Sequence, residues 1–90
     1  MTLVDAVEGK EYIIQKIDTD DEELNSFLFS LGCYVGEPIT VVSHLKGGCV
    51  VSIKDGRYNI DNQLAAAIYI WFMFKTVYFG IKLVLDNYIL

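Results

Sequence analysis

Cations, histidine and proline are scarce in this sequence. Its 90 residues include seven lysines and arginines, one histidine and one proline against twelve acidic residues, so the formal net charge is −5. Binding to a phosphate backbone requires clustered lysine and arginine side chains, and a nucleic acid is therefore not an expected partner. Hydrophobic residues make up 53% and charged residues 21%, which predicts a globular chain with one domain.

Motifs of catalysis, cofactor binding and export are also missing. No glycine-rich loop is followed by Lys-Ser or Lys-Thr, so Gly47-Gly48 is interpreted as a turn and not as a phosphate loop. No nucleophile has a base near it in a recognisable motif. Residues 1–9 lack the basic start and apolar run of a secretory signal. We therefore expect a cytoplasmic protein that is not an enzyme and that uses no cofactor.

The strongest helical pattern precedes Gly32. Four apolar residues recur at the spacing i, i+3, i+4 and i+7, namely Leu24, Phe27, Leu28 and Leu31. This spacing predicts a short amphipathic helix that buries one stripe. Two capping boxes compete at its start, Thr19 with Glu22 and Asp20 with Glu23. Gly32 is suited to end the helix.

Alternation between apolar and polar residues predicts strands on both sides of this helix. The five predicted strands are Glu11–Ile17, Pro38–Leu45, Cys49–Lys54, Arg57–Ile60 and Ile68–Ile70. Two hairpin turns are expected, at Gly47-Gly48 and at Asp55-Gly56. In the second strand, the alternation predicts one face that carries Ile39, Val41, Ser43 and Leu45.

Two shorter segments are expected to form single helical turns. Thr2–Val7 is predicted to plug one end of the fold, and Gln63–Ala67 is predicted to follow a cap at Asp61 or Asn62. With the five strands, these elements predict a mainly β fold, a small SH3-like barrel with one short α-helix after the first strand.

The same residues resemble the FeoA family of small bacterial ferrous-iron transport proteins. The likeness runs from Leu3 to about Ile70 and rests on Gly9, Leu28–Gly36, Ile39–Val42, Gly56–Ile60 and Leu64–Ile68. It divides the chain into a FeoA-like domain over residues 1–70 and an apolar extension over residues 71–90. The resemblance implies an SH3-like fold and an accessory role in ferrous-iron uptake, in which the protein binds the cytoplasmic part of the FeoB membrane GTPase.

Phe29 is the most informative candidate for a contact with a partner. On a helical wheel it lies away from the predicted apolar stripe, so its side chain should face outward. An outward aromatic ring can anchor a partner, or it can be covered by another part of the same chain. We expect the contact surface to combine Phe29 with Tyr34 and with the loop residues Leu45, Lys46 and Gly47.

Two other functions remain open. The chain could be a small metal-binding carrier that uses Cys33, His44, Cys49 or the acidic run Asp18–Glu23. No Cys-x-x-Cys or His-x-x-x-His spacing supports this, so we favour buried thiols, a structural or solvent-facing His44, a solvated helix cap and no metal site. The chain could also be the interaction domain of an iron-responsive regulator, which would associate with a DNA-binding chain.

The extension over residues 71–90 is largely apolar, with Lys75, Lys82 and Asp86 as its charged residues. The uncharged run that reaches into it, Asn62–Phe74, is shorter than the roughly 20 residues of a membrane-spanning helix. Helical spacing and strand alternation compete in the extension, and a helix is favoured. The segment is expected to pack on its own barrel, on a second copy in self-association, or on a membrane or the transporter.

Overall fold

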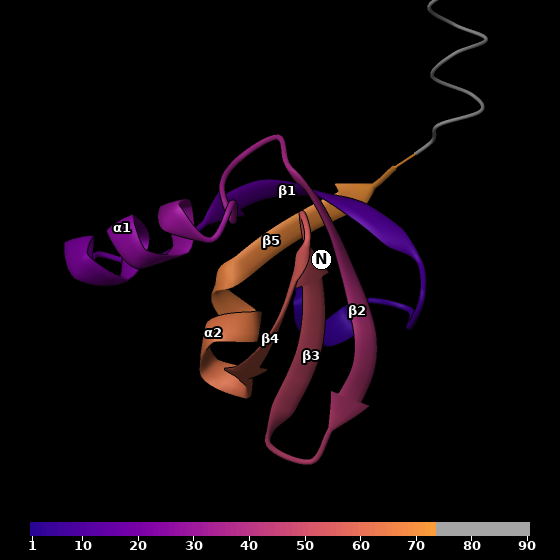
Figure 1. Ribbon diagram of the computed structural model, residues 1–90. Helices are drawn as coiled ribbons and strands as arrows, with labels where there is room; N and C mark the ends of the chain where they lie inside the picture. Colours follow the sequence, from indigo (N-terminus) through magenta and orange to yellow (C-terminus); the bar gives the residue numbers. More distant parts are fainter. Residues whose placement is uncertain (74–90) are drawn as a thin grey trace, which may run out of the picture.

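Five antiparallel strands form a single sheet in the order β4-β3-β2-β1-β5 (Figure 1). The computed structural model describes residues 1–73. The strands are β1 (Glu11–Ile17), β2 (Pro38–Leu45), β3 (Gly48–Ile53), β4 (Gly56–Asp61) and β5 (Ile68–Phe72). The helical elements are the 3-10 turn η1 (Leu3–Asp5), α1 (Glu22–Ser30) and α2 (Asn62–Ala67). Each predicted strand is confirmed to within two residues at its ends.

The core lies on the concave side of this sheet and is built by alternate strand residues. In β3, Cys49, Val51 and Ile53 are all buried, whereas Val50 and Ser52 between them are only partly buried. The other strands add Tyr12, Ile14, Ile39, Val41, Ile68 and Ile70. Each fully buried aliphatic or aromatic side chain contributes about 1.5–3 kcal/mol relative to an exposed one, so this layer supplies most of the drive for folding.

The predicted face of β2 is correct in its first half and wrong in its second half. Ile39 and Val41 are buried, but the pairing with β3 shifts register between Val41 and Ser43. A bulge of this kind inserts one extra residue and changes the face on which the following side chains lie. Leu45 is therefore exposed at the end of the strand and does not lie on the same face as Val41.

The turn between β3 and β4 is centred one residue earlier than the sequence predicts. Ile53 pairs with Gly56, so Lys54 and Asp55 form the turn, and Lys54 takes the positive φ of 53°. Gly56 serves another purpose, because a Cβ atom there would lie 2.2 Å from the hydroxyl of Tyr58. The glycine leaves room for the Tyr58 side chain to lie across its own strand.

Helix α1 is capped and packed differently from the prediction. Asp21 is the N-cap, with its Oδ1 accepting from the Leu24 amide at 3.0 Å, so neither predicted capping box forms. Only Leu28 of the predicted stripe is buried, whereas Phe27 is 58% exposed. Figure 1 shows that α1 projects from the sheet, and of its side chains only Leu28 is buried while Leu24 packs partly against the core.

The N-terminal segment and α2 close the fold at one end. Leu3 in η1 is fully buried, and the Met1 carbonyl accepts from the Ile70 amide at 3.0 Å. Thr2 caps η1 in a reciprocal box with Asp5. Asp61 is the N-cap of α2, with its Oδ1 accepting from the Leu64 amide at 2.8 Å, which decides between the two predicted caps.

Strand β5 continues to Phe72, two residues beyond the predicted end at Ile70. Trp71 and Phe72 therefore belong to the sheet and not to a C-terminal helix. The rest of the predicted helix lies in residues 74–90, outside the described residues. No helix within residues 1–73 has the length and apolar character to cross a membrane.

Candidate protein-binding surface

Phe29 and Tyr34, two of the predicted contact residues, lie face to face on the surface. Their ring centroids are 4.7 Å apart, and the ring planes are inclined by 31°. Phe29 is 64% exposed, so the prediction that it faces outward is confirmed. An aromatic pair held in this way offers a large apolar contact whose side-chain entropy is already reduced before binding.

The sequence after α1 explains how the two rings come together. Gly32 adopts a φ of +89°, and its amide donates to the Phe29 carbonyl at 3.0 Å. The Cys33 amide donates to the Leu28 carbonyl at 2.9 Å. These two bonds form a Schellman motif, which requires a left-handed residue at the position of Gly32. The motif turns the chain back on itself, so that Tyr34 lies beside Phe29.

An ion pair borders the two rings. Lys54 Nζ lies 2.9 Å from Glu37 Oε2 and 5.6 Å from the centroid of the Tyr34 ring. The hydrogen bond from Lys54 holds the pKa of Glu37 below its usual value, and a hydrogen bond from Tyr34 lowers it by a smaller amount. The same bond between Lys54 and Glu37 raises the pKa of Lys54. The side chain of Lys54 is 50% exposed, so solvent screens this pair. We call Phe29, Tyr34, Glu37 and Lys54 the Tyr34 cluster.

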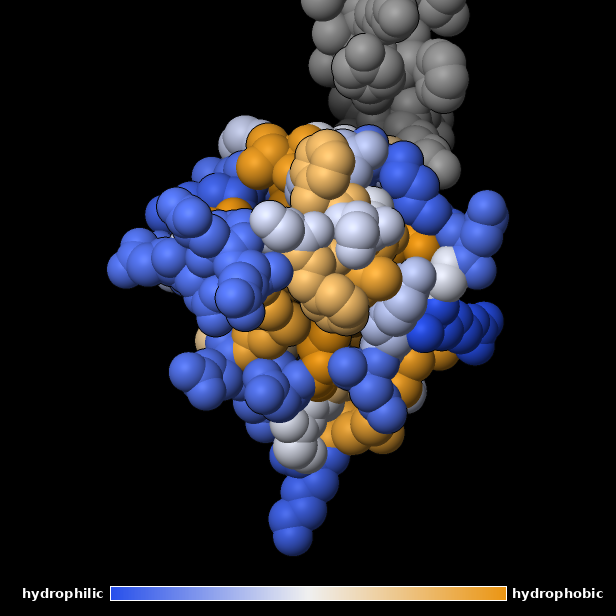
Figure 2. Space-filling model, turned by 60° about the vertical axis from the view of Figure 1, so that its left-hand side comes forward, coloured by the Kyte–Doolittle hydropathy of each residue, from blue (hydrophilic) through white to orange (hydrophobic). Residues whose placement is uncertain are grey.

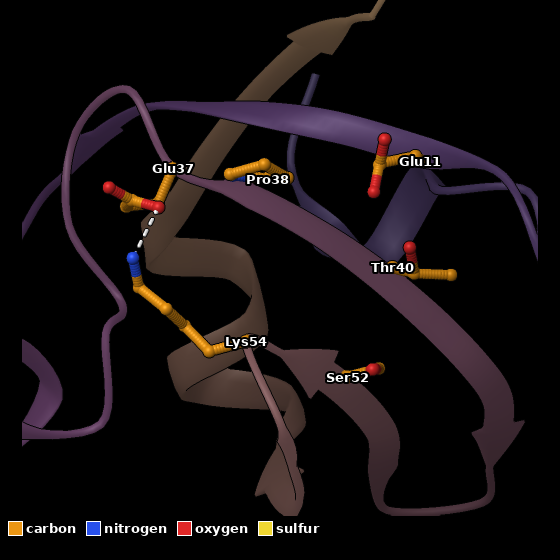
Figure 3. Close-up of a pocket in the computed structure, with 6 residues that line it drawn as sticks. All are labelled: Glu11, Glu37, Pro38, Thr40, Ser52 and Lys54. Carbon is orange, nitrogen blue, oxygen red and sulfur yellow. Dashed lines mark ion pairs between the residues drawn. The ribbon is translucent and has the colours of Figure 1, made fainter.

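A shallow polar pocket of about 310 Å³ adjoins the cluster (Figure 3). In Figure 3 the Glu37–Lys54 ion pair closes one end, and three strands supply the other lining residues, which are Glu11, Pro38, Thr40 and Ser52. Two carboxylates and two hydroxyls lie in this lining, so a partner with hydrogen-bond donors can be accommodated there.

The apolar part of the surface lies on α1 and on the loop that follows it. Figure 2 shows the side of the molecule that carries α1, where apolar side chains form a band bordered by hydrophilic ones. Phe29 and Val35 are strongly exposed. Phe27 is also exposed, but it lies two residues from Phe29 and therefore on another face of α1. Exposed aromatic side chains such as Phe29 are enriched at protein contacts.

The other three predicted contact residues lie on a separate surface. Leu45, Lys46 and Gly47 form the β2–β3 hairpin, which Figure 1 shows well apart from α1. Asn62 holds this hairpin, because its backbone amide donates to the Gly47 carbonyl at 3.0 Å and its side-chain Nδ2 to the Lys46 carbonyl at 3.4 Å. The structure thus brings Phe29 and Tyr34 together but does not bring the hairpin to them.

Sequence reasoning missed Lys54 and Glu37 as neighbours of Tyr34. Lys54 occupies the β3–β4 turn and Glu37 precedes β2, so their contact depends on how the sheet folds and not on a local spacing. The one local signal is Gly32. A Cβ atom on it would lie 2.7 Å from Lys54 Cγ, so the residue after the helix must be small as well as left-handed.

The cysteine and histidine candidates for metal ligands are either buried or hydrogen-bonded to the backbone. Cys33 and Cys49 are free and buried, as predicted, and burial raises the pKa of Cys33 to about 11. His44 Nε2 lies 2.7 Å from the Ala6 carbonyl, and the His44 amide donates to Glu8 Oε2 at 2.5 Å. Within residues 1–73, no three histidine, cysteine or acidic side chains form a group that could hold a metal ion.

Comparison with known proteins identifies the family of the chain. A model of the FeoA domain family matches residues 1–70. Comparison with curated protein sequences gives no match. The structure of iron(II) transport protein A from Clostridium thermocellum is similar, with a TM-score of 0.73 and 23% identity over 81% of this chain and 46% of that chain.

Two further structures extend the comparison. An iron uptake regulatory protein (FeoA) has a TM-score of 0.68 and 22% identity over 78% of this chain and 93% of that chain. The regulator ScaR with bound Cd²⁺ has a TM-score of 0.70 and 21% identity over 81% of this chain and 35% of that chain. The chain thus spans less than half of the Clostridium protein and of ScaR. These likenesses confirm the predicted SH3-like fold.

Proposed function

Because the chain belongs to the FeoA domain family, we propose that it is a cytosolic accessory protein of ferrous-iron uptake that binds the cytoplasmic part of a FeoB-type membrane GTPase. Ferrous iron is the cargo of the transporter in this proposal, and the protein acts by binding and not by catalysis. The observation that supports binding is the exposed, ordered stack of Phe29 on Tyr34 beside the Glu37–Lys54 pair.

The Tyr34 cluster has the composition of an interface centre. Phe29 would enter an apolar pocket on the partner, since large side chains at the centre of an interface dominate its binding energy. Glu37 and Lys54 would lie at the rim, where charges contribute more to orientation and association rate than to affinity. The Schellman turn at Gly32 fixes the ring positions in advance, which lowers the entropy lost on binding.

The test is binding of the full chain to the purified GTPase region of the transporter, measured by calorimetry. We expect Phe29→Ala to weaken binding by about tenfold or more, as truncation at an interface hot spot does. Phe27→Ala is the matched control, because Phe27 is similarly exposed on the same helix but makes no ring stack within the described residues. The loss of binding free energy caused by Phe27→Ala is expected to be less than half of that caused by Phe29→Ala.

The hairpin residues provide the second arm of this experiment. Leu45→Ala should leave binding unchanged if the Tyr34 cluster is the whole contact, and should weaken it if the sequence-based surface of Leu45, Lys46 and Gly47 also takes part. Full binding by Phe29→Ala with weak binding by Leu45→Ala would move the site to the hairpin. No binding by the unmodified chain would refute the adaptor function itself.

The two other functions predict different results in the same samples. A metal-binding carrier would take up ferrous ions stoichiometrically when titrated without oxygen, although both thiols are buried and His44 is bonded to the Ala6 carbonyl. A regulator domain would associate with a DNA-binding chain and not with the GTPase region. No observation on the described residues favours either of these over the adaptor.

A further inference from the structure

Four side chains form a row across the outer face of the sheet. Glu11 of β1 is paired with Thr40 of β2, Thr40 with Ser52 of β3, and Ser52 with Arg57 of β4. Side chains of directly paired residues lie close together on the same face of a sheet. We call Glu11, Thr40, Ser52 and Arg57 the outer row.

The burial of neighbouring residues shows that the outer row faces away from the core. Successive side chains of a strand point to opposite faces of the sheet. The residues next to the outer row in β1, β2 and β3 are buried, namely Tyr12, Ile39, Val41, Val51 and Ile53. The row itself therefore points outward, with Arg57 exposed and its other three members partly buried.

Three of the four outer-row residues line the polar pocket beside the Tyr34 cluster. In Figure 3 the Glu11 and Thr40 side chains point toward one another, with Ser52 on the next strand. Neither the Thr40 nor the Ser52 hydroxyl has a hydrogen-bond partner among residues 1–73. Glu11 has an interaction of its own, but a carboxylate offers about four acceptor positions and can take a further donor. The pocket thus presents several acceptors to a group with several N–H donors.

Arg57, the only arginine of the chain, carries such a group. A guanidinium has five N–H donors in a planar fork, which suits carboxylate and hydroxyl acceptors. Within the part of the chain that the structure describes, Arg57 makes neither an ion pair nor a cation–π contact. Glu11 of the same chain lies three strands away, roughly 14 Å at the usual strand spacing, which one arginine side chain does not bridge.

The order of chemical groups in the outer row is self-complementary. From β1 to β4 it runs carboxylate, hydroxyl, hydroxyl, guanidinium. When a second copy faces the first across a twofold axis parallel to the strands, Glu11 of each copy lies opposite Arg57 of the other. The same axis places Thr40 of each copy opposite Ser52 of the other. A twofold interface makes every such contact twice.

We propose that the outer row pairs two copies of this chain, with Arg57 of each copy in the polar pocket of the other. Small polar interfaces are weak, so the dimer forms at high protein concentration and dissociates when salt screens its charges. The pocket adjoins the Tyr34 cluster, so the dimer covers part of that cluster. The proposal concerns this chain alone and does not depend on the proposed function.

The test is sedimentation velocity of the full chain over a range of protein concentrations, at low and at high salt. We expect a monomer–dimer equilibrium that salt weakens. Arg57→Glu and Glu11→Arg should each weaken it about tenfold or more, because each variant places like charges opposite one another at both ends of the row. Lys46→Glu is the matched control for Arg57→Glu, since it makes the same change of charge at an exposed residue of the β2–β3 hairpin, and it should change the equilibrium by less than about twofold.

Mixing the two variants tests the pairing of Glu11 with Arg57 directly. In a mixed dimer, the copy with Glu11→Arg presents two arginines, and the copy with Arg57→Glu presents two glutamates opposite them. An equimolar mixture should therefore dimerise although neither variant does so alone. A mixture of Glu11→Arg with Lys46→Glu has the same total charge but keeps one pair of like charges in the row, so it should not regain the dimer. Circular dichroism verifies that each variant folds.

Three results would overturn the proposal. The first is a monomer at every concentration, which leaves the pocket to another ligand. The second is a dimer that Arg57→Glu does not weaken, which assigns self-association to another part of the chain, such as residues 74–90. The third is an equal loss with Arg57→Glu and Lys46→Glu, which leaves only an effect of net charge. If Glu11→Arg does not fold, the comparison of these two variants decides alone. Binding to the transporter GTPase region is measured separately, so either proposal can fail without the other.

Discussion

Lys54 Nζ lies 2.9 Å from Glu37 Oε2, and this contact joins the β3–β4 turn to the loop that leads into β2. The same lysine lies over the ring of Tyr34, and its aliphatic stem lies over the backbone of Gly32. One side chain from a hairpin turn thus supports three features of the binding surface. Lys54 tolerates its positive φ of 53° because the turn between Ile53 and Gly56 requires it.

The Glu37–Lys54 pair predicts a specific dependence of stability on pH. The pKa of Glu37 is lowered in the folded protein from its usual 4.5, so the contribution of the pair is present above that value and is lost as the pH falls through the folded pKa. The pKa of Lys54 is raised from 10.5, so the contribution is present below that value and is lost as the pH rises through the folded pKa. Urea midpoints of wild type and Glu37→Gln should therefore differ at neutral pH and converge in acid. A constant difference across the acid range would contradict this.

Gly32→Ala should destabilise the protein, and it should also displace Lys54 in the Tyr34 cluster. A left-handed backbone costs alanine about 1–2 kcal/mol, and the new Cβ atom would lie 2.7 Å from Lys54 Cγ. Gly47→Ala is the control, because its Cβ atom would meet no atom within 4 Å and its backbone is not in the left-handed region. Urea unfolding should show a lower midpoint for Gly32→Ala alone. Equal midpoints would mean that the turn after α1 is not fixed as described.

The sequence predicts the elements of this fold well because the strands carry their own pattern. In β3, Cys49, Val51 and Ile53 alternate with less buried residues over the whole strand, so periodicity alone identifies the inward face. The failures have a common physical cause in contacts between distant segments. The bulge that exposes Leu45 is a property of the β2–β3 pair, and no pattern within β2 reveals it.

Phe27 and Lys54 illustrate the same limit for the candidate site. A helical wheel assumes that a helix lies along the core, but α1 projects from the sheet and leaves Phe27 exposed. The outward position of Phe29 was predictable because it follows from the helical spacing, which is a local feature. Lys54 was not, since its place beside Tyr34 depends on the position of a turn in another hairpin.

Tyr12→Phe should loosen the N-terminal segment. Tyr12 is fully buried, and its hydroxyl accepts from the Val7 amide at 2.9 Å. Removing the oxygen leaves that amide without its acceptor and should cost about 1 kcal/mol of unfolding free energy. Tyr69→Phe removes the same atom from a tyrosine with no hydroxyl hydrogen bond within residues 1–73 and serves as the control. Amide hydrogen exchange should accelerate at Val7 in the first variant and stay unchanged there in the second.

The thiol of Cys33 should be nearly inert in the folded protein. Its side chain is 1% exposed, and burial raises its pKa to about 11, so little of the reactive thiolate exists at neutral pH. Alkylation by iodoacetamide, followed by peptide mass spectrometry, should be about 100-fold slower or more in buffer than in urea, because both access and thiolate fraction are lost on folding. The pKa of Cys49 is raised for the same reason, so both cysteine peptides should show the protection. Rapid labelling of either peptide under native conditions would show that its thiol is accessible. That cysteine would then again be a candidate ligand for the metal-binding carrier function.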